Sequence, residues 1–355
     1  MASLRVVNRL VCRGFIVLTL LLMFFNEVLI YYIAQSRWHS IDCQHENCTR
    51  LLLIADPQIL GNSYDRSSHS PLARYDSDRY LQKSFERAIS FTQPHIIVFL
   101  GDLLDEGNIA TAQEYKQYVK RFKRIFQNKK FTKRVHVPGD NDIGGDNGDY
   151  ISNSNQRRFE NEFMSEDLFD YDNHLRFFKI NRMLLDFTNP DKDNNADRLR
   201  IGVSHAPLLI GGGPLLRAII SDLDPHIIFS GHWHESRIFI YPSTKVINFY
   251  ENAVRHFDLK ALKEQDHSYL EIMVPTCSYR MGKSKIGMGY AVLEDYNLSY
   301  TVLWQPNRFI LLFTYVFWGL FVLCGGIVYK MMTRCPFRVV KRHTQYSRVS
   351  NVPQF

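Results

Sequence analysis

The chain has 355 residues, 45% of them hydrophobic, which is enough to bury the core of one large domain or of two small ones. Its net charge of +7 would by itself suggest a nucleic-acid partner. However, nine of the 43 basic residues and one of the 36 acidic residues lie in or beside two terminal apolar runs, which leaves the middle of the chain at about −1. The charge therefore gives no case for nucleic-acid binding, and we expect none.

The first apolar run covers residues 14–34 and approaches the roughly 20 residues that a helix needs to cross a bilayer. Asn26 and Glu27 interrupt this run, and its more apolar half, residues 15–25, could also be the core of a cleaved signal peptide. Residues 31–33, Tyr-Tyr-Ile, do not form the small-residue pattern of a cleavage site. We therefore favour an uncleaved transmembrane signal anchor.

Two features after this run fit an oxidising compartment outside the cytosol. Cys43 and Cys48 are close enough in sequence to form a small disulfide loop, although two free thiols are an equally acceptable interpretation. Asn47 and Asn297 each begin an Asn-x-Ser/Thr pattern, which is the acceptor for N-linked glycosylation and is also common by chance. Neither feature decides the compartment alone.

The middle of the chain alternates apolar segments of strand length with amphipathic helical patterns, which predicts a layered α/β domain. Thr111 and Glu114 have the spacing of a helix capping box. The expected strands are residues 51–55, 96–100, 135–137, 177–180, 183–186 and 201–204; the expected helices are 80–89, 111–126 and one that opens at Pro214, and 187–198 is expected to be a loop.

A local sequence echo marks two of the strands. Residues 93–99 and 224–229 both contain Pro-His followed by an apolar strand, and a Gly-Asp or Gly-His pair comes after the strand. His95 and His226 lie at the starts of these strands, away from the carboxyl ends where ligands collect in α/β sheets. We therefore interpret both histidines as structural.

The second apolar run, residues 309–329, contains no charged residue and lies between Arg308 and Lys330, which favours a membrane span over a core helix. Basic residues precede the first run and follow the second, and such residues mark cytosolic flanks. We therefore predict two cytosolic tails, residues 1–13 and 330–355, and a lumenal domain formed by residues 35–308.

Five separate segments of the middle domain place carboxylates or imidazoles directly after a predicted strand or an apolar segment. Together they form a borderline ligand set suited to manganese, iron or zinc, although any one of them alone would more often be an ordinary polar residue. These side chains are Asp56, Asp102 with Asp105, Asp140 to Asp142, His205, and His232 with His234.

The order of these blocks resembles the calcineurin-like metallophosphoesterase family, whose signature runs Asp-x-His, Gly-Asp-x-x-Asp, Gly-Asn-His-Asp/Glu, His and Gly-His-x-His. The resemblance covers about residues 51–294 and implies a layered αββα sandwich flanked by two transmembrane helices. The blocks here read Asp56-Pro57-Gln58, Gly101-Asp102-Leu103-Leu104-Asp105, Gly139-Asp140-Asn141-Asp142, His205 and Gly231-His232-Trp233-His234.

The resemblance also implies a two-metal phosphoesterase with two divalent ions per chain. Manganese is the first expectation, with iron or zinc as alternatives, and the nucleophile would come from water without a covalent enzyme intermediate. Carried over residue by residue, Asp56, Asp102 and His234 would hold one ion, and Asp102, Asp140, His205 and His232 the other, so that Asp102 bridges them.

Three positions depart from the family pattern. Gln58 replaces a histidine ligand, and Asp140 replaces an asparagine ligand. Asn141 stands where the family has the histidine that protonates the leaving oxygen, and an amide can at most orient phosphate. His69 is our candidate for a substitute catalytic acid, with an ordinary exposed loop histidine as the alternative. We expect Asp105 and Asp142 to orient the ligands and the neighbouring backbone.

Residues 55–58 and 278–282, Ala-Asp-Pro-Gln and Ser-Tyr-Arg-Met-Gly, resemble the membrane-anchored branch that removes ethanolamine phosphate from a mannose of GPI-anchor glycans. This resemblance implies GPI-anchored proteins as lipid-linked substrates during their maturation and transport. It also implies a location in the endoplasmic reticulum, its exit sites and the Golgi. Arg280 could contact phosphate or glycan, or form a structural salt bridge.

Two other functions stay open. A catalytically weak or silent relative could bind and sort GPI-anchored proteins as an adaptor, an alternative that Asn141 and Gln58 motivate. A phosphoesterase of the same chemistry could also act on another lumenal substrate. Turnover, rather than metal content, separates the adaptor from the enzymes, because a silent relative could retain metal.

Overall fold

The fold is taken from a computed structural model of the whole chain. Contacts divide the chain into two compact units, one from residues 1–20 and 310–355 and the other from residues 21–309, and each is described by itself. The structure describes residues 2–45, 47–64, 67–128, 132–145, 150–188, 198–210, 213–243, 245–265 and 267–334, without the side chains of 2–9 and 332–334.

The unit formed by the chain ends consists of helical segments from both apolar runs. Helix α1 is Ala2–Phe24 and helix α9 is Arg308–Arg334. The side chains of Phe15 and Trp318 pack with ring centroids 6.1 Å apart, and Trp318 Nε1 donates to Thr19 Oγ1 at 2.9 Å. Both runs are long and apolar enough to cross a membrane. The structure thus suggests a membrane protein. The assignment of residues 1–13 and 330–355 to the cytosol stays a prediction. Residues 335–355 lie outside the described part.

The first helix continues past α1 into the larger unit. A π-helical turn, η1 (Phe25–Leu29), begins beside the interruption that Asn26 and Glu27 make in the apolar run, and α2 (Ile30–Gln35) follows it. The side chains of Asn26 and Tyr31 are buried there, and the Tyr31 ring packs on that of Tyr80 at 6.1 Å. The end of the predicted anchor is therefore packed against the folded domain.

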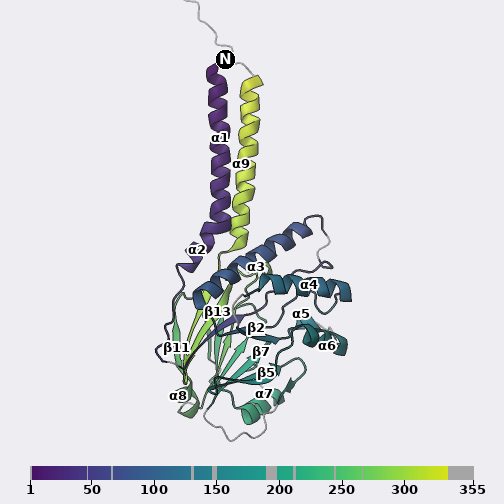
Figure 1. Ribbon diagram of the computed structural model, residues 1–355, viewed down its shortest axis with the longest axis vertical. Coiled ribbons are helices and arrows are strands. Elements are labelled where there is room, and N and C mark those ends of the chain that lie inside the picture. The colour runs from purple at the N-terminus through teal and green to yellow at the C-terminus, as the bar shows by residue number, and fades with distance from the viewer. Residues whose placement is uncertain are drawn as a thin grey trace, which may run out of the picture. The chain divides into compact units, whose positions relative to one another are not determined.

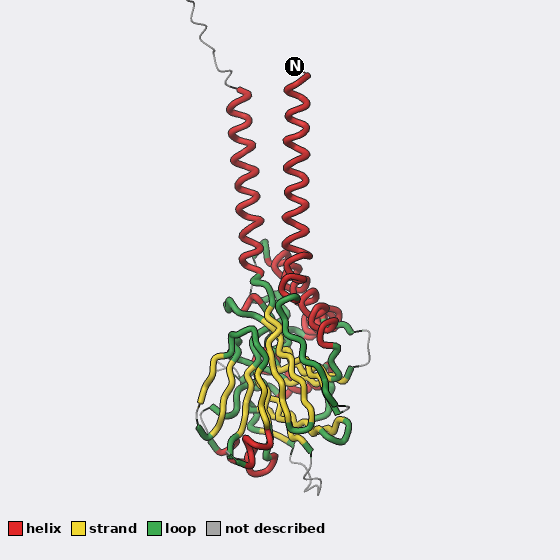
Figure 2. The backbone as a smooth tube through the Cα atoms, turned by 90° about the vertical axis from the view of Figure 1, so that its left-hand side faces the viewer, coloured by secondary structure: helices red, strands yellow, loops and turns green. Residues whose placement is uncertain are grey.

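The larger unit contains two sheets, whose strands are drawn in yellow in Figure 2. In the first sheet β1, β2 and β3 are parallel and the remaining neighbours are antiparallel. Its six strands follow the order β11 (Arg255–Asp258), β14 (Asn297–Trp304), β13 (Gly287–Glu294), β1 (Cys48–Ile54), β2 (Ile96–Leu100), β3 (Lys133–Val137).

The second sheet repeats this plan, because its central strands β5, β7, β8 and β12 are parallel. A short strand, β6 (Asp186–Phe187), pairs with β5 beside the main path. The main path runs β10 (Lys245–Asn248), β9 (Arg237–Tyr241), β12 (Tyr269–Met273), β8 (Ile227–Ser230), β7 (Leu199–Ser204), β5 (Leu175–Asn181), β4 (Leu168–Tyr171).

The two sheets pack face to face, and helices cover their outer faces. Leu53 and Val98 of the first sheet share one buried cluster with Ile201 and Val203 of the second, so these side chains form the inner core. Figure 1 shows α3 and α4 on one side of the sheets and α7 on the other. The predicted αββα sandwich is confirmed. The helices of this unit are α3 (Ser70–Thr92), α4 (Ala112–Ile125), α5 (Asp140–Ile143), α6 (Asn153–Glu162), α7 (Pro214–Ala218) with η2 (Ile219–Leu223), α8 (Leu259–Glu264) and the 3-10 turn η3 (Tyr279–Met281).

Several local predictions are confirmed. The Thr111 hydroxyl accepts from the Glu114 amide in a complete capping box, and Cys43 forms a disulfide with Cys48. The ring Nδ1 atoms of His95 and His226 accept from backbone amides of neighbouring strands at 3.2 and 3.0 Å, which is the structural role expected for both.

Two predicted boundaries are wrong. The expected strand at 183–186 is a turn over residues 182–185, because the Asn181 side chain accepts from the amides of Met183 and Leu184, and only Asp186 and Phe187 pair as β6. Helix α3 begins ten residues earlier than its apolar spacing indicated. The loop expected at 187–198 lies mostly outside the described residues.

Candidate metal centre

Strand ends of both sheets bring the predicted ligands together. The backbone at these ends is unusual, because non-glycine residues with a positive φ are uncommon and cluster at functional sites. Gly101 also has a φ of +89°, and a Cβ there would collide with the His205 ring. The non-glycine residues with a positive φ are Asp56 (49°), Gln58 (42°), Asp102 (50°), His232 (74°) and His234 (61°).

Three ligand atoms converge in the first part of the centre. Asp140 Oδ1 lies 2.9 Å from His205 Nε2 and 3.1 Å from His232 Nδ1, and these two ring nitrogens are 3.2 Å apart. Separations of about 3 Å match neighbouring ligand atoms around an octahedral ion with bonds of roughly 2.1 Å. The set can therefore hold one divalent ion.

The tautomer of His205 supports this interpretation. Its Nδ1 lies 2.8 Å from the carbonyl oxygen of Leu100, which can only accept, so Nδ1 carries the proton. In the neutral ring Nε2 then offers a lone pair, and it points at a carboxylate oxygen of Asp140. The repulsion between two facing lone pairs is removed either by a proton on Nε2 or by a cation between the two atoms. The geometry thus fits a metal ion.

The second part of the centre contains Asp56, Asp102 and His205, whose ligand atoms all lie within 4.8 Å of one another. His205 Nε2 is 3.5 Å from Asp102 Oδ1, and His234 Nε2 is 3.8 Å from Asp56 Oδ1. Both aspartates and His205 are buried. His205 belongs to both parts of the centre, so the two parts are adjacent.

The electrostatics of the centre favour added positive charge. Burial raises the pKa of Asp56 and of Asp102. Burial also acts to raise the pKa of Asp140, but hydrogen bonds from His205 and His232 outweigh it and lower that pKa. Within the described residues, only histidines form ion pairs with these three carboxylates. Divalent cations would supply the missing charge.

Asp142 joins two ligand-bearing loops. Its buried carboxylate accepts from the amides of Leu103 and Leu104 at 3.1 and 3.0 Å, and from the Gly139 amide at 2.9 Å. Burial raises the pKa of Asp142 to about 6, against the effect of these amides. This is the orienting role predicted for Asp142, because it fixes the loop after β2 against the loop after β3.

Asn141 and Gln58 both contact Asp102. Asn141 donates to both carboxylate oxygens of Asp102. Its backbone N–H donates to Oδ1 at 3.0 Å, and its side-chain Nδ2 donates to Oδ2 at 3.1 Å. Gln58 Nε2 lies 3.1 Å from Asp102 Oδ2 and 3.4 Å from His234 Nε2. These two of the three departures from the family signature therefore lie within the centre. Rotation of the Gln58 amide would turn its oxygen toward the ligand atoms.

His69 lies apart from these contacts. It is exposed, it precedes α3, and its Nε2 lies 3.1 Å from Ser67 Oγ. Its contact in the described structure is with this hydroxyl rather than with the ligand set. A role of His69 as the catalytic acid stays a prediction that the described geometry does not support.

Two residues that the sequence interpretation missed hold the loops of the centre. Glu106 is buried, and its carboxylate accepts from the amides of residues 62–64, which anchors the loop after Gln58. Thr276 Oγ1 donates to the carbonyl oxygen of Asp56 at 2.9 Å. For Glu106, the available sequence signal was a glutamate directly after the Gly-Asp-x-x-Asp block. No local pattern indicated Thr276.

A cavity of about 250 Å³ is bordered by Leu60, Arg74, Asp105 and Arg280 among others, and by none of the six predicted ligands. Burial, and next the charge of Glu106, raise the pKa of Asp105 to about 6, whereas Arg280 lowers it. The Arg280 guanidinium has no hydrogen bond or ion pair with the described residues, so the salt-bridge interpretation of Arg280 gains no support.

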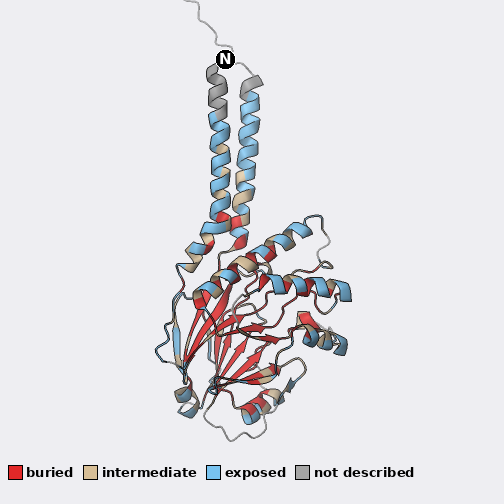
Figure 3. Ribbon diagram, viewed as in Figure 1, coloured by how far each residue is buried: buried red, intermediate tan, exposed pale blue. Residues whose placement is uncertain are grey.

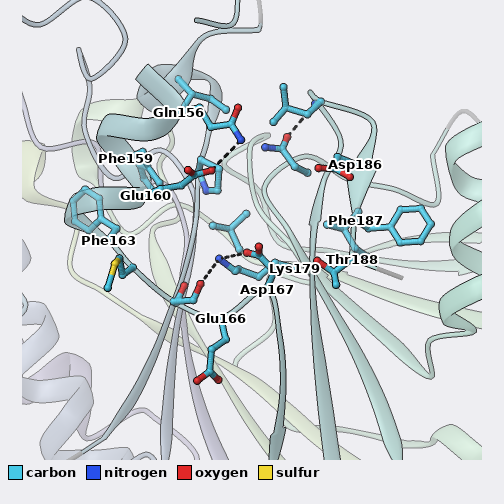
Figure 4. A pocket seen from close by; sticks show the side chains of 18 of the residues that line it. Gln156, Phe159, Glu160, Phe163, Glu166, Asp167, Lys179, Asp186, Phe187 and Thr188 are labelled. Carbon is cyan, nitrogen blue, oxygen red and sulfur yellow. Dashed lines mark hydrogen bonds and ion pairs between the residues drawn. The ribbon is translucent and has the colours of Figure 1, made fainter. Parts of the chain in front are cut away.

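A larger cavity of about 660 Å³ lies between α6, β3 and the β5–β6 hairpin. Figure 4 shows Phe159, Phe163 and Lys179 around it. Lys179 pairs with Asp167 at 2.6 Å, so its charge is neutralised locally. The cavity borders Thr188, beyond which residues 189–197 are not described, and we assign it no role.

Comparisons with known proteins give one family and several partial relatives. The profile described as calcineurin-like phosphoesterase matches residues 49–236. Metallophosphoesterase 1 of Macaca fascicularis is 27% identical over 194 residues, which cover 52% of this chain and 47% of that protein. The protein of the same name from Danio rerio is 30% identical over 123 residues, which cover 34% of this chain and 31% of that protein. The matched segments span about half the length of these relatives or less.

The solved structures that match this chain share little sequence with it. A metallophosphoesterase from Sphaerobacter thermophilus is 13% identical with a TM-score of 0.36, covering 72% of this chain and 88% of that one. A structure described as GAP50, the anchor in the inner membrane complex of Plasmodium, is 11% identical with a TM-score of 0.40. The match covers 72% of this chain and 84% of that one.

Proposed function

Because the chain belongs to the calcineurin-like phosphoesterase family, we propose that it is a membrane-anchored phosphodiesterase that removes ethanolamine phosphate from a mannose of GPI anchors. The observation that carries the proposal is the convergence of three aspartates and three histidines at the strand ends of both sheets. These side chains are Asp56, Asp102, Asp140, His205, His232 and His234.

The reaction consumes water and breaks the bond between phosphorus and the mannose oxygen. Two divalent ions, when bound, supply activation of the attacking water and stabilisation of the charge on the phosphoryl oxygens. Asp102, fixed by Asn141 and Gln58, would help to hold both ions, and the Asn141 amide would also orient the phosphate. The mannose oxygen takes up a proton and becomes a hydroxyl as its bond to phosphorus breaks, and His69 is the candidate donor.

The substrate assignment rests on three supports. The blocks at residues 55–58 and 278–282 resemble the GPI-remodelling branch, and the curated relatives are named Metallophosphoesterase 1. The two apolar helices suit a substrate that is itself linked to a lipid. Arg280 and Arg74 border the same cavity as Asp105, where guanidinium groups could contact phosphate on the glycan. We propose that GPI-anchored proteins are the partners, in the endoplasmic reticulum and Golgi, with manganese, iron or zinc bound.

The second candidate is an adaptor that binds GPI-anchored proteins without turning them over. Asn141 favours it, because the loss of a catalytic acid lowers the rate by about 10² to 10⁴-fold. Metal-assisted attack of water does not itself depend on that acid, so its loss would slow hydrolysis without abolishing it. We therefore rank hydrolysis first.

The purified full chain, loaded with manganese, is expected to release ethanolamine phosphate from a GPI glycan that carries it on mannose. Mass spectrometry of the released product measures the rate, and His232→Ala, which loses a ligand, provides the blank. A chain that binds the glycan but releases no product above this blank would favour the adaptor. Turnover of simple phosphodiesters without turnover of the glycan would point to another lumenal substrate.

A further inference from the structure

Charged side chains tie the outer face of α3 to the ends of the two apolar helices. Glu27 Oε2 lies 2.9 Å from Lys83 Nζ and 3.1 Å from Arg79 Nε, and both of these residues belong to α3. Arg308, the first residue of α9, lies 2.7 Å from Glu27 through Nη2 and donates from Nε to Asp76 at 3.1 Å. These contacts fix α3 beside the points where the chain leaves the folded domain for the apolar helices.

The positions involved define one stripe of the helix. Residues 76, 79 and 83 are three and four apart, so their side chains share a face. Arg87 lies four residues after Lys83 and so continues this stripe. Its guanidinium stacks over the Tyr32 ring at 4.2 Å. The opposite face of α3 is buried in the domain, as Figure 3 shows, and includes Leu81 and Phe85.

The N-terminal part of the same stripe is apolar and uncovered. Leu72 lies four residues before Asp76, and Tyr75 lies four residues before Arg79, so both face the same way as the tethered positions. The side chains are 69% and 62% exposed, and Tyr64, in the loop before the helix, is 63% exposed. Single exposed apolar residues are ordinary on protein surfaces. Here they extend a stripe that already contacts the ends of both apolar helices.

We infer that Tyr64, Leu72 and Tyr75 form a membrane-contact surface that lies in the headgroup region of the bilayer. Tyrosine suits that region, because its ring is apolar and its hydroxyl stays hydrated, and leucine can reach the acyl boundary. The bilayer is the expected occupant because the tethered part of the stripe contacts Glu27, within the first candidate span, and Arg308, the first residue of the second.

This surface would set the height of the metal centre above the membrane. The inward side of the first turns of α3 contributes Ser70, Ala73 and Arg74 to the small cavity that Asp105 also borders. Asp105 follows Asp102 by three residues. If the proposed function holds, the contact presents the cavity and the metal-bearing loop to a glycan whose lipid stays in the bilayer.

Nitroxide labels test the contact without relying on activity. We would label Leu72→Cys and Tyr75→Cys in the full chain with Cys12, Cys324 and Cys335 changed to serine; Cys277 is buried and Cys43 and Cys48 are bonded to each other. In phosphatidylcholine nanodiscs, power saturation should show greater access to oxygen than to a water-soluble nickel chelate at both positions. Met164→Cys and Leu185→Cys, two exposed apolar positions outside α3, are matched controls that should show the reverse.

Greater access to the nickel chelate than to oxygen at both α3 positions would overturn the inference, whatever the protein hydrolyses. An activity measurement adds a second arm. Leu72→Ser with Tyr75→Ser should raise KM for a membrane-bound glycan substrate about tenfold, through lost apolar burial, and leave hydrolysis of bis(p-nitrophenyl) phosphate unchanged. Equal losses of activity on both substrates would show that these side chains stabilise the folded domain and do not contact the membrane. Failure of the glycan reaction in every variant would reject the proposed function and leave the nitroxide result valid.

Discussion

Replacement of His205 by alanine is expected to remove almost all turnover, by about 10³-fold or more, and to lower the occupancy of both metal ions. The expected effect is large because the His205 ring belongs to both parts of the centre. It lies near Asp140 and His232 in one part, and near Asp56 and Asp102 in the other. Loss of even one group that stabilises charge in a transition state commonly costs about 10² to 10³-fold. The measurement is metal content by plasma mass spectrometry together with phosphodiester hydrolysis.

His226→Ala is the matched control for this change. His226 is also a largely buried histidine of the second sheet, and its ring accepts from the Arg200 amide at 3.0 Å. Its loss should lower stability by about 1 kcal/mol, the typical contribution of one hydrogen bond, and leave metal content intact. If His205→Ala kept both ions and the full rate while His226→Ala behaved as expected, the arrangement of the centre would be wrong.

Replacement of Asp142 by alanine is expected to lower the free energy of unfolding by about 3 kcal/mol or more and to reduce turnover by at least about tenfold. Three backbone amides lose their buried acceptor, and each amide left unsatisfied costs roughly 1 to 3 kcal/mol. The loops that carry Asp102 and Asp140 also lose their link, so the ligand atoms lose their relative positions. Chemical denaturation and phosphodiester hydrolysis measure the two effects.

Asp186→Ala provides the comparison, because Asp186 is an exposed aspartate in a β-strand of the second sheet. A surface change of this kind should alter stability by about 0.5 kcal/mol or less. Equal small effects of both substitutions would mean that the Asp142 carboxylate does not hold the two loops. Asp142→Asn should fall between them, because its amide oxygen can still accept from part of this set.

The sequence was sufficient to predict the sandwich and the residues of the centre for a physical reason. Strand β2 is a continuous apolar run and β1 ends in one, and each of β1, β2 and β3 is followed directly by a loop with a ligand carboxylate. Parallel strands bring such loops to one edge of a sheet, so the order along the chain indicates the arrangement in space. His69 had no strand end to place it, and its assignment rested only on its position in the polar loop after the first block and on the need for a substitute for Asn141.

Contacts between distant segments could not be predicted in this way. The first ten residues of α3 expose Leu72 and Tyr75 and bury polar side chains such as Asp78, so their apolar spacing was too weak to reveal the helix, although Pro71 marks its first turn. Glu106 acts through amides more than 40 residues earlier in the chain. The turn at 182–185 depends on the side chain of Asn181, which periodicity does not register.

The most direct test of the two-metal centre is the metal content of the purified full chain, measured by plasma mass spectrometry after dialysis against metal-free buffer. We expect about two transition-metal ions per chain. Asp102→Asn should reduce the occupancy of both together, because Asp102 is the predicted bridging ligand and lies 3.5 Å from His205 Nε2, which belongs to both clusters. A chain that binds no metal ion, or an Asp102→Asn variant that keeps two, would contradict the account.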